Sequence, residues 1–146
     1  DGFKAALRLK TENKKYFDLL SKYRSQFEFK EKNNVHLKSR FPMISLSTDG
    51  ELIGIYFNNR SIGPITDVPY SLMLDYYKAY RKFSNIIDDP KMAIEFKLKP
   101  GQCFIVDNSR VLHARTAYYG SGNRWLQGCY ADKDGLLSSI LTEKNN

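Results

Sequence analysis

Apolar residues recur at helical spacing in two stretches near the start of the chain. One stripe covers residues 3–7 and a second covers residues 16–23. Steps of three and four positions place such side chains on one face of a helix. The pattern therefore predicts two short helices, with the second opened by a capping residue at Thr11 or Asn13.

The spacing then changes to the alternation that is typical of strands. The pattern predicts two strands within residues 26–41, joined by a turn at residues 33–34. It predicts a second pair of strands at residues 42–46 and 51–59. The sequence Asp49-Gly50 between the members of that second pair is a hairpin signal. We therefore expect two antiparallel pairs in succession.

A longer helix is predicted over residues 71–87, where apolar side chains follow one another at steps of three or four positions. Alternating or continuous apolar runs then predict strands at 92–98, 103–106 and 124–131, and residues 135–141 predict a short final helix. Hairpins with one inserted helix favour a mainly β fold with helices, arranged as an antiparallel barrel or sandwich. No repeat or linker divides the chain, so residues 1–146 are expected to belong to one domain.

Composition narrows the class of protein. The chain has 146 residues, of which 42% are hydrophobic and 14% aromatic, and this argues against a disordered protein. No apolar run reaches eighteen residues, so we expect no membrane span. Cys103 and Cys129 lack metal-binding spacing and lie in apolar runs, where we expect buried, reduced thiols.

The net charge of +7 is unevenly distributed. Residues 1–40 carry eleven Lys or Arg against five Asp or Glu, whereas residues 41–146 carry twelve against eleven. Acidic residues are interspersed among the N-terminal cations, and no nucleic-acid recognition motif accompanies them. A solvated helix face is the favoured interpretation, with a nucleic-acid-binding domain as an alternative.

Two residues near the end of the chain are candidates for chemistry. His113 follows an apolar run and is surrounded in sequence by polar and charged residues, which is compatible with a metal ligand or with a hydrogen-bonded histidine. Arg124 opens the apolar run 124–131. It can form a strand-end ion pair or clamp a ligand carboxylate with its planar guanidinium. Spacing alone leaves both alternatives open.

The run KPGQCFIVDNSRVLHARTAYYGSGNRWLQGCYADKD resembles the C-terminal signature of the Fe(II)- and 2-oxoglutarate-dependent oxygenases of carnitine biosynthesis, the γ-butyrobetaine and trimethyllysine dioxygenase family. DGFKAALRLK and IYFNNRSIGPITDVPY resemble earlier blocks of the same catalytic domain, in the same order. The resemblance covers nearly the whole chain. It implies a double-stranded β-helix, the jelly roll shared with taurine dioxygenase-like enzymes.

The resemblance also implies roles for four residues. His113 matches the distal histidine of the 2-His-1-carboxylate iron site, and Arg124 matches the arginine that binds the far carboxylate of 2-oxoglutarate. Tyr130 matches a ring of the aromatic cage around the substrate's trimethylammonium group. Asn58 matches a polar residue that contacts the substrate carboxylate. An ordinary strand tyrosine and a turn asparagine are the alternatives for the last two.

Some parts of the family pattern are not found in the sequence. The nearer histidine and carboxylate form a His-x-Asp motif in the family, and this chain has no His-x-Asp or His-x-Glu. Ser109 stands where relatives commonly have Trp, and Trp125 follows Arg124. We therefore expect the chain to be the C-terminal part of a longer catalytic domain, inactive alone.

For that longer protein the resemblance implies hydroxylation of γ-butyrobetaine to L-carnitine, with Fe(II), 2-oxoglutarate and ascorbate as reductant. Trimethyllysine is the alternative substrate, and a non-catalytic jelly-roll binding module is the alternative from another class. A small trimethylammonium molecule is the expected partner, with neither nucleic acid nor membrane, and a homodimer of the longer protein is compatible with the sequence. The expected location is the cytoplasm, or the mitochondrial matrix for trimethyllysine hydroxylation.

Overall fold

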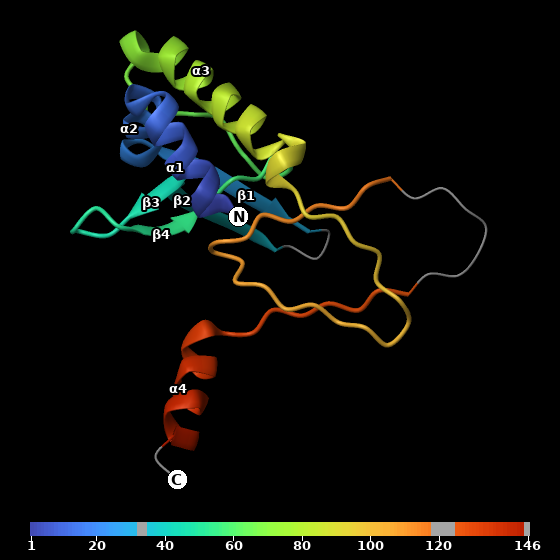
Figure 1. Ribbon diagram of the computed structural model, residues 1–146. Helices are drawn as coiled ribbons and strands as arrows, with labels where there is room; N and C mark the ends of the chain where they lie inside the picture. The colour runs from blue at the N-terminus through green and yellow to red at the C-terminus, as the bar shows by residue number, and fades with distance from the viewer. Residues whose placement is uncertain (32–34, 118–124, 145–146) are drawn as a thin grey trace. The chain divides into compact units, whose positions relative to one another are not determined.

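The computed structural model describes residues 1–31, 35–117 and 125–144. The chain divides into two compact units, Asp1–Ala114 and Arg115–Asn146. Among the described residues, the first unit contains three α-helices, one short 3₁₀ helix and two small antiparallel sheets, and the second contains the α-helix α4 (Lys133–Lys144) (Figure 1).

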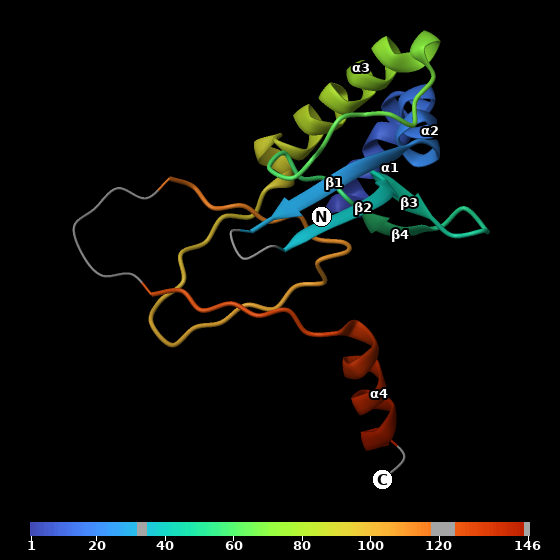
Figure 2. The same cartoon turned by 180° about the vertical axis from the view of Figure 1, so that it is seen from behind.

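Three α-helices form one side of the first unit. They are α1 (Gly2–Glu12), α2 (Lys14–Lys22) and α3 (Tyr70–Ile87), and each contacts the other two. Figures 1 and 2 show them grouped together beside the strands. Asn13 separates α1 from α2 and caps the second, because its Oδ1 accepts a hydrogen bond from Tyr16 N at 3.0 Å. The predicted helices, including Asn13 as an opening residue, are confirmed.

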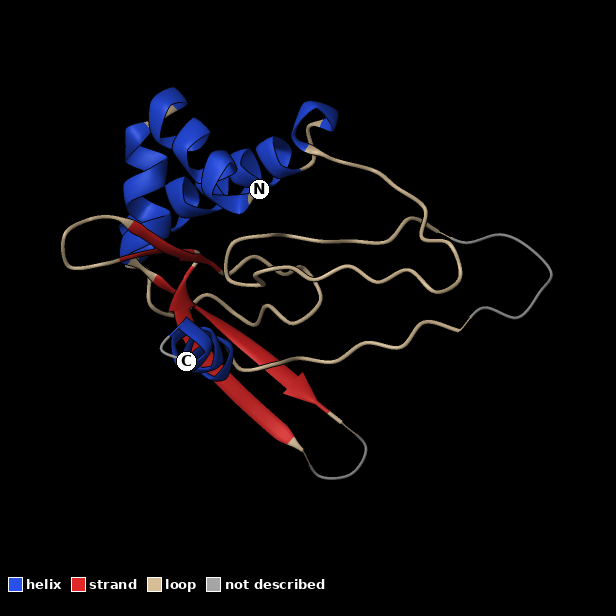
Figure 3. Cartoon of the chain, turned by 60° about the horizontal axis from the view of Figure 1, so that its bottom comes forward, coloured by secondary structure: helices blue, strands red, loops and turns tan. Residues whose placement is uncertain are grey.

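The strands form two separate antiparallel pairs, which are drawn in red in Figure 3. Strand β1 (Arg24–Lys30) pairs with β2 (His36–Pro42), and β3 (Ile44–Leu46) pairs with β4 (Leu52–Ile55). The hairpin between β3 and β4 turns at Gly50, whose φ of 82° is readily adopted by glycine. Both predicted pairs are confirmed. The predicted turn at residues 33–34 lies outside the described residues.

The core lies between the helices and the strands. Helix α1 contributes Leu9, α3 contributes Tyr76 and Phe83, and the strand side contributes Met43 and Ile44, all almost fully buried. The hydroxyl groups of Ser25 and Tyr76 lie 2.8 Å apart within this core and satisfy each other. Two members of the apolar stripe that predicted α3, Tyr76 and Phe83, therefore lie in the core.

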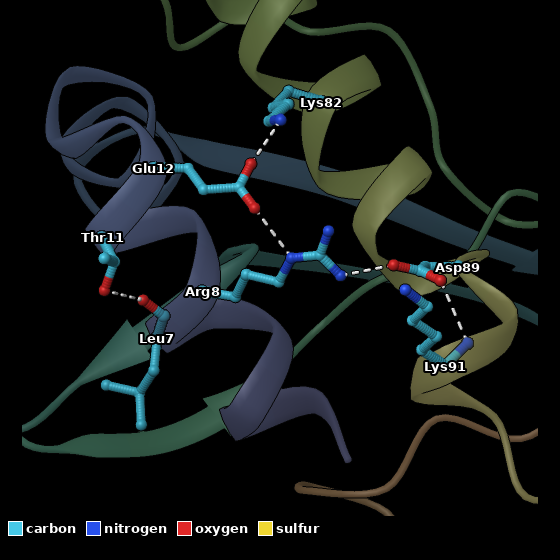
Figure 4. Close-up of polar contacts among 7 residues, drawn as sticks. All are labelled: Leu7, Arg8, Thr11, Glu12, Lys82, Asp89 and Lys91. Carbon is cyan, nitrogen blue, oxygen red and sulfur yellow. Dashed lines mark hydrogen bonds and ion pairs between the residues drawn. The ribbon is translucent and has the colours of Figure 1, made fainter.

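A network of ion pairs joins the outer surfaces of α1 and α3 (Figure 4). Arg8 Nε lies 2.7 Å from Glu12 Oε1, and Arg8 Nη1 lies 2.5 Å from Asp89 Oδ2. The other Glu12 carboxylate oxygen pairs with Lys82 on α3. Asp89 also caps the 3₁₀ turn η1 (Pro90–Met92) by accepting a hydrogen bond from Lys91 N at 3.0 Å. The network fixes the point at which the chain leaves α3.

The three strands predicted after α3 are not found in the described residues. Residues 93–99, 102–106 and 125–131 have no regular secondary structure. Small antiparallel sheets with helices are present as predicted, but within the described residues the helices contain more residues than the strands, and the jelly roll is not confirmed. A strand needs a neighbour for its backbone N–H and C=O groups, and none pairs with these segments there.

The same segments correct the prediction for the cysteines. Cys103 and Cys129 are both free thiols, as predicted, but both are exposed and not buried. Several of their apolar neighbours, including Ile105 and Trp125, are also exposed. Among the helices described, none is long and apolar enough to cross a membrane.

Candidate functional site

Asn58 lies in the segment that follows β4. Its side-chain Oδ1 accepts hydrogen bonds from Arg60 N at 2.8 Å and from Ser61 N at 3.3 Å. This is the local turn bonding that asparagine commonly makes. The Asn58 amide nitrogen makes no hydrogen bond within the part of the chain that the structure describes, and the residue is exposed. Asn58 therefore combines a turn role with a pair of N–H donors available to a ligand.

The Asn58 segment is attached to β1 on one side. Glu28 N donates to Ser61 O at 2.7 Å, and Gly63 N donates to Gln26 O at 2.8 Å. An isolated antiparallel bridge between Phe27 and Ile62 lies between these two hydrogen bonds. The residues after Asn58 therefore continue along the edge of β1, which fixes the downstream end of the turn.

His113 follows a turn that is tied to the N-terminal helix and to β4. Gly2 N donates to Arg110 O at 2.9 Å, and Ile55 N donates to Ser109 O at 2.8 Å. Asp1 Oδ2 accepts from Arg110 Nη2 at 2.8 Å. These contacts fix the position of the backbone at Arg110, three residues before His113. The His113 side chain itself is exposed.

The polar residues around His113 make contacts within this turn and with the first residues of the chain. Asp107 Oδ1 accepts hydrogen bonds from Ser109 N at 3.0 Å and from Ser109 Oγ at 2.6 Å. The Arg110 guanidinium lies 5.2 Å from the ring centre of Phe3, in addition to its ion pair with Asp1. The sequence identified these polar neighbours but gave no signal that the first residues of the chain are their partners.

The described residues do not by themselves fit an iron centre. No group of three His, Cys, Asp or Glu side chains able to hold a metal ion occurs in the described ranges. His36 is the first residue of β2, and its Nε2 lies 3.4 Å from Glu28 Oε2 on β1. His113 is left as one candidate ligand of a site that needs three protein ligands.

The two remaining predicted residues belong to the second unit. Arg124 lies outside the described residues. Tyr130 is described and is 89% exposed, without a ring contact to any other described residue. Asn58 and His113 both belong to the first unit, so the structure gives no geometry that joins all four predicted residues.

Comparison with known proteins identifies the family. Residues 1–130 match the model of the "Taurine catabolism dioxygenase TauD, TfdA family". The chain belongs to the TauD, TfdA family. This match spans the three helices, both hairpins and the segment that contains His113, and it confirms the resemblance seen in the ordered sequence blocks.

Individual members of the TauD, TfdA family show the same similarity. The chain is 37% identical to the γ-butyrobetaine dioxygenase of Pseudomonas sp. (strain AK-1) over 97% of its length, covering 37% of that protein. It is 31% identical to human γ-butyrobetaine dioxygenase over 96% of its length, again covering 37% of the relative. It is 34% identical to the mitochondrial trimethyllysine dioxygenase of Gallus gallus over 95% of its length, covering 34% of that protein. The chain therefore spans little more than a third of the relatives that it matches.

Proposed function

We propose that this chain is the C-terminal part of the catalytic domain of an Fe(II)- and 2-oxoglutarate-dependent dioxygenase that hydroxylates γ-butyrobetaine to L-carnitine. The observation that carries the proposal is the family match over residues 1–130, together with 37% identity to a γ-butyrobetaine dioxygenase. Ascorbate is the proposed reductant. The proposed location is the cytoplasm.

Four residues have roles in this proposal. His113 is one iron ligand, and the other two come from the part of the longer protein that corresponds to the rest of the relatives' length. Arg124 holds the far carboxylate of 2-oxoglutarate by two parallel hydrogen bonds. Asn58 donates from its amide nitrogen to the substrate carboxylate, and Tyr130 offers its ring face to the trimethylammonium group. The available Asn58 donors and the exposed Tyr130 ring support these two assignments.

The proposed fold of the longer protein is a jelly roll. Three segments have the alternating or continuous apolar pattern of strands but no strand partner in the described residues. They are residues 93–99, 102–106 and 125–131. Exposed apolar side chains such as Ile94, Phe96 and Ile105 need a covering layer in a folded protein. We propose that strands from the rest of the longer protein pair with these segments.

The intact protein that contains this chain tests the activity. With Fe(II), 2-oxoglutarate and ascorbate supplied, γ-butyrobetaine is expected to stimulate succinate formation and to yield carnitine. Greater stimulation by trimethyllysine would instead support the alternative substrate, which the 34% identity to a trimethyllysine dioxygenase favours. That alternative carries a mitochondrial location with it.

A non-catalytic binding module is the second candidate, because the described residues bring together no set of metal ligands. It predicts that the intact protein binds a trimethylammonium compound but forms no succinate with any of these substrates. The 146-residue chain alone is expected to form none under either proposal, so only the intact protein distinguishes them.

Replacement of Arg124 tests the assignment of the co-substrate site. In the active intact protein, Arg124→Ala is expected to raise the KM for 2-oxoglutarate by about 10- to 100-fold, since a charge-assisted bidentate contact is lost. The KM for γ-butyrobetaine is expected to change far less. Equal increases in both KM values would contradict the role of Arg124.

A further inference from the structure

The segment that carries Asn58 is held from the helical side by a cluster of aromatic residues. Phe57 stacks on Tyr80 of α3, with ring centres 5.4 Å apart and planes at 24°. Phe57 also meets the edge of Phe83, with ring centres 5.7 Å apart and planes at 88°. Phe83 is fully buried, so the residue directly before Asn58 is anchored in the core.

The residue directly after Asn58 is held by the same helix. The hydroxyl group of Tyr80 donates a hydrogen bond to Asn59 Oδ1. Partial burial raises the pKa of Tyr80, so the hydroxyl keeps the proton that it donates at neutral pH. Tyr80 therefore contacts both neighbours of Asn58, through its ring on one side and its hydroxyl on the other.

These contacts limit the orientation of the Asn58 side chain. Its Oδ1 is already engaged by Arg60 N and Ser61 N, and Ser61 O accepts from Glu28 N on β1. Because its Oδ1 is engaged and the residues on each side are held by α3 and β1, rotation of the Asn58 amide group is restricted. A donor fixed before binding loses less conformational freedom when the ligand arrives.

We propose that Tyr80 is a positioning residue, which holds the Asn58 amide nitrogen in place as a hydrogen-bond donor to the carboxylate of the substrate. This inference rests on the proposed function and deepens it. Tyr80 acts through Asn59 and Phe57 and does not itself touch the substrate. The ligand class at this position is the carboxylate end of a small trimethylammonium acid.

The experiment uses the intact enzyme with γ-butyrobetaine. Tyr80→Phe keeps the ring but removes the hydroxyl, and Asn59→Ala removes its acceptor on an exposed residue. Each is expected to raise the KM for γ-butyrobetaine by about 2- to 10-fold, the loss expected from one neutral hydrogen bond. The KM for 2-oxoglutarate and the kcat are expected to stay unchanged, as is the melting temperature within about 3 °C.

Tyr77→Phe is the matched control. Tyr77 lies one turn earlier on α3, is 51% exposed and makes no hydrogen bond to another described residue. Loss of its hydroxyl is expected to leave the KM for γ-butyrobetaine unchanged. An increase equal to that of Tyr80→Phe would overturn the inference, because any phenol on this helix would then have the same effect.

A double-mutant cycle separates positioning from general damage. Asn58→Ala is expected to raise the KM for γ-butyrobetaine by about 10- to 100-fold, and adding Tyr80→Phe to it is expected to change the KM less than about 2-fold. If Tyr80→Phe raised the KM for γ-butyrobetaine by the same factor with and without Asn58, the role of Tyr80 would be overturned and the proposed function left intact. Absence of any γ-butyrobetaine turnover by the unmodified intact protein would overturn both. If Tyr80→Phe does not fold, Asn59→Ala in the same cycle decides the question.

Discussion

Residues 1–92 and residues 93–106 belong to the same compact unit but differ in how they bury apolar side chains. In the first region Leu9, Tyr76 and Phe83 are almost completely buried between helices and strands. In the second region Ile94, Phe96 and Ile105 are exposed, although the sequence of that region is just as apolar. Apolar character alone therefore does not decide burial. The difference is whether enough other elements pack around the side chain, since Phe96 stays exposed although its ring meets Phe104.

The largest expected effect on stability comes from truncating a core ring in the first region. Truncation of an exposed ring in the second region is the comparison. Phe83→Ala is expected to lower the free energy of unfolding of the 146-residue chain by about 3–5 kcal/mol, because it leaves a large cavity. Phe96→Ala is expected to lower it by less than about 1 kcal/mol, since Phe96 is 65% exposed. Urea denaturation of the two variants measures both values.

The same pair of variants sharpens the comparison when it is made in the intact protein. If the jelly roll proposed above covers residues 93–106, Phe96→Ala is expected to lower the free energy of unfolding of the intact protein by nearly as much as Phe83→Ala does. A loss that stays below about 1 kcal/mol in the intact protein would mean that Phe96 is not a core residue there.

A second prediction concerns the junction between the two ends of this unit. A Cβ added at Gly2 would lie 2.7 Å from Arg110 O and 3.0 Å from Ile55 Cγ1. The backbone carbonyl cannot move without lengthening the hydrogen bond from Gly2 N. We therefore expect Gly2→Ala to lower the free energy of unfolding by about 1–3 kcal/mol.

Amide hydrogen exchange checks the location of that effect. In Gly2→Ala, exchange is expected to increase at Gly2-linked positions, namely the start of α1 and the turn at residues 107–111. Ala5→Gly in the same helix serves as a control, because it weakens α1 without a steric clash. An identical exchange pattern in both variants would show that the contact with Arg110 has no special role.

A third, smaller effect is expected from the buried hydroxyl pair. Tyr76→Phe removes the partner of Ser25, whose side chain is fully buried. Leaving that hydroxyl unsatisfied is expected to lower the free energy of unfolding by about 1–2 kcal/mol. The double variant with Ser25→Ala is expected to regain part of this loss, and a further additive loss would contradict the pairing.

Local patterns predicted the packed region well. The stripe of apolar residues that includes Tyr80 and Phe83 predicted α3, and Asp49-Gly50 marked the hairpin in which Gly50 has positive φ. Both signals depend on neighbours within a few positions. The strands predicted at 92–98 and 103–106 were wrong for the described residues, since alternation specifies the faces of a strand but not the existence of its partner.

The candidate site was predictable to a smaller extent. The resemblance singled out Asn58 and His113, and the structure shows what supports each of them. Nothing in the sequence indicated that Tyr80, 21 residues from Asn59, bonds to it, because Tyr80 also fits the core stripe of α3. The contact of Gly2 with Arg110 was equally hidden, since it joins positions 108 residues apart.

The smallest expected effect concerns Asp89, which marks the boundary between the packed and the exposed regions. Hydrogen bonds from Arg8, and then from Lys91 N, lower the pKa of Asp89, and hydrogen bonds from Lys82 and Arg8 lower that of Glu12. A carboxyl group with a lowered pKa in the folded state adds stability above its ordinary pKa of about 4. That contribution is lost as the pH falls through the lowered value.

Asp89→Asn is therefore expected to be slightly less stable than the unmodified protein at pH 7, with the difference shrinking as the pH falls through the lowered pKa of Asp89. Urea denaturation between pH 2 and pH 7 measures it, with Asp49→Asn as a control in an exposed hairpin turn. Because Asp89 holds the point where the chain leaves α3, faster amide exchange in residues 90–99 is expected at neutral pH in Asp89→Asn alone. Unchanged exchange there would show that the boundary depends on the core side of α3, through residues such as Phe83 and Ile86, and not on its surface ion pairs.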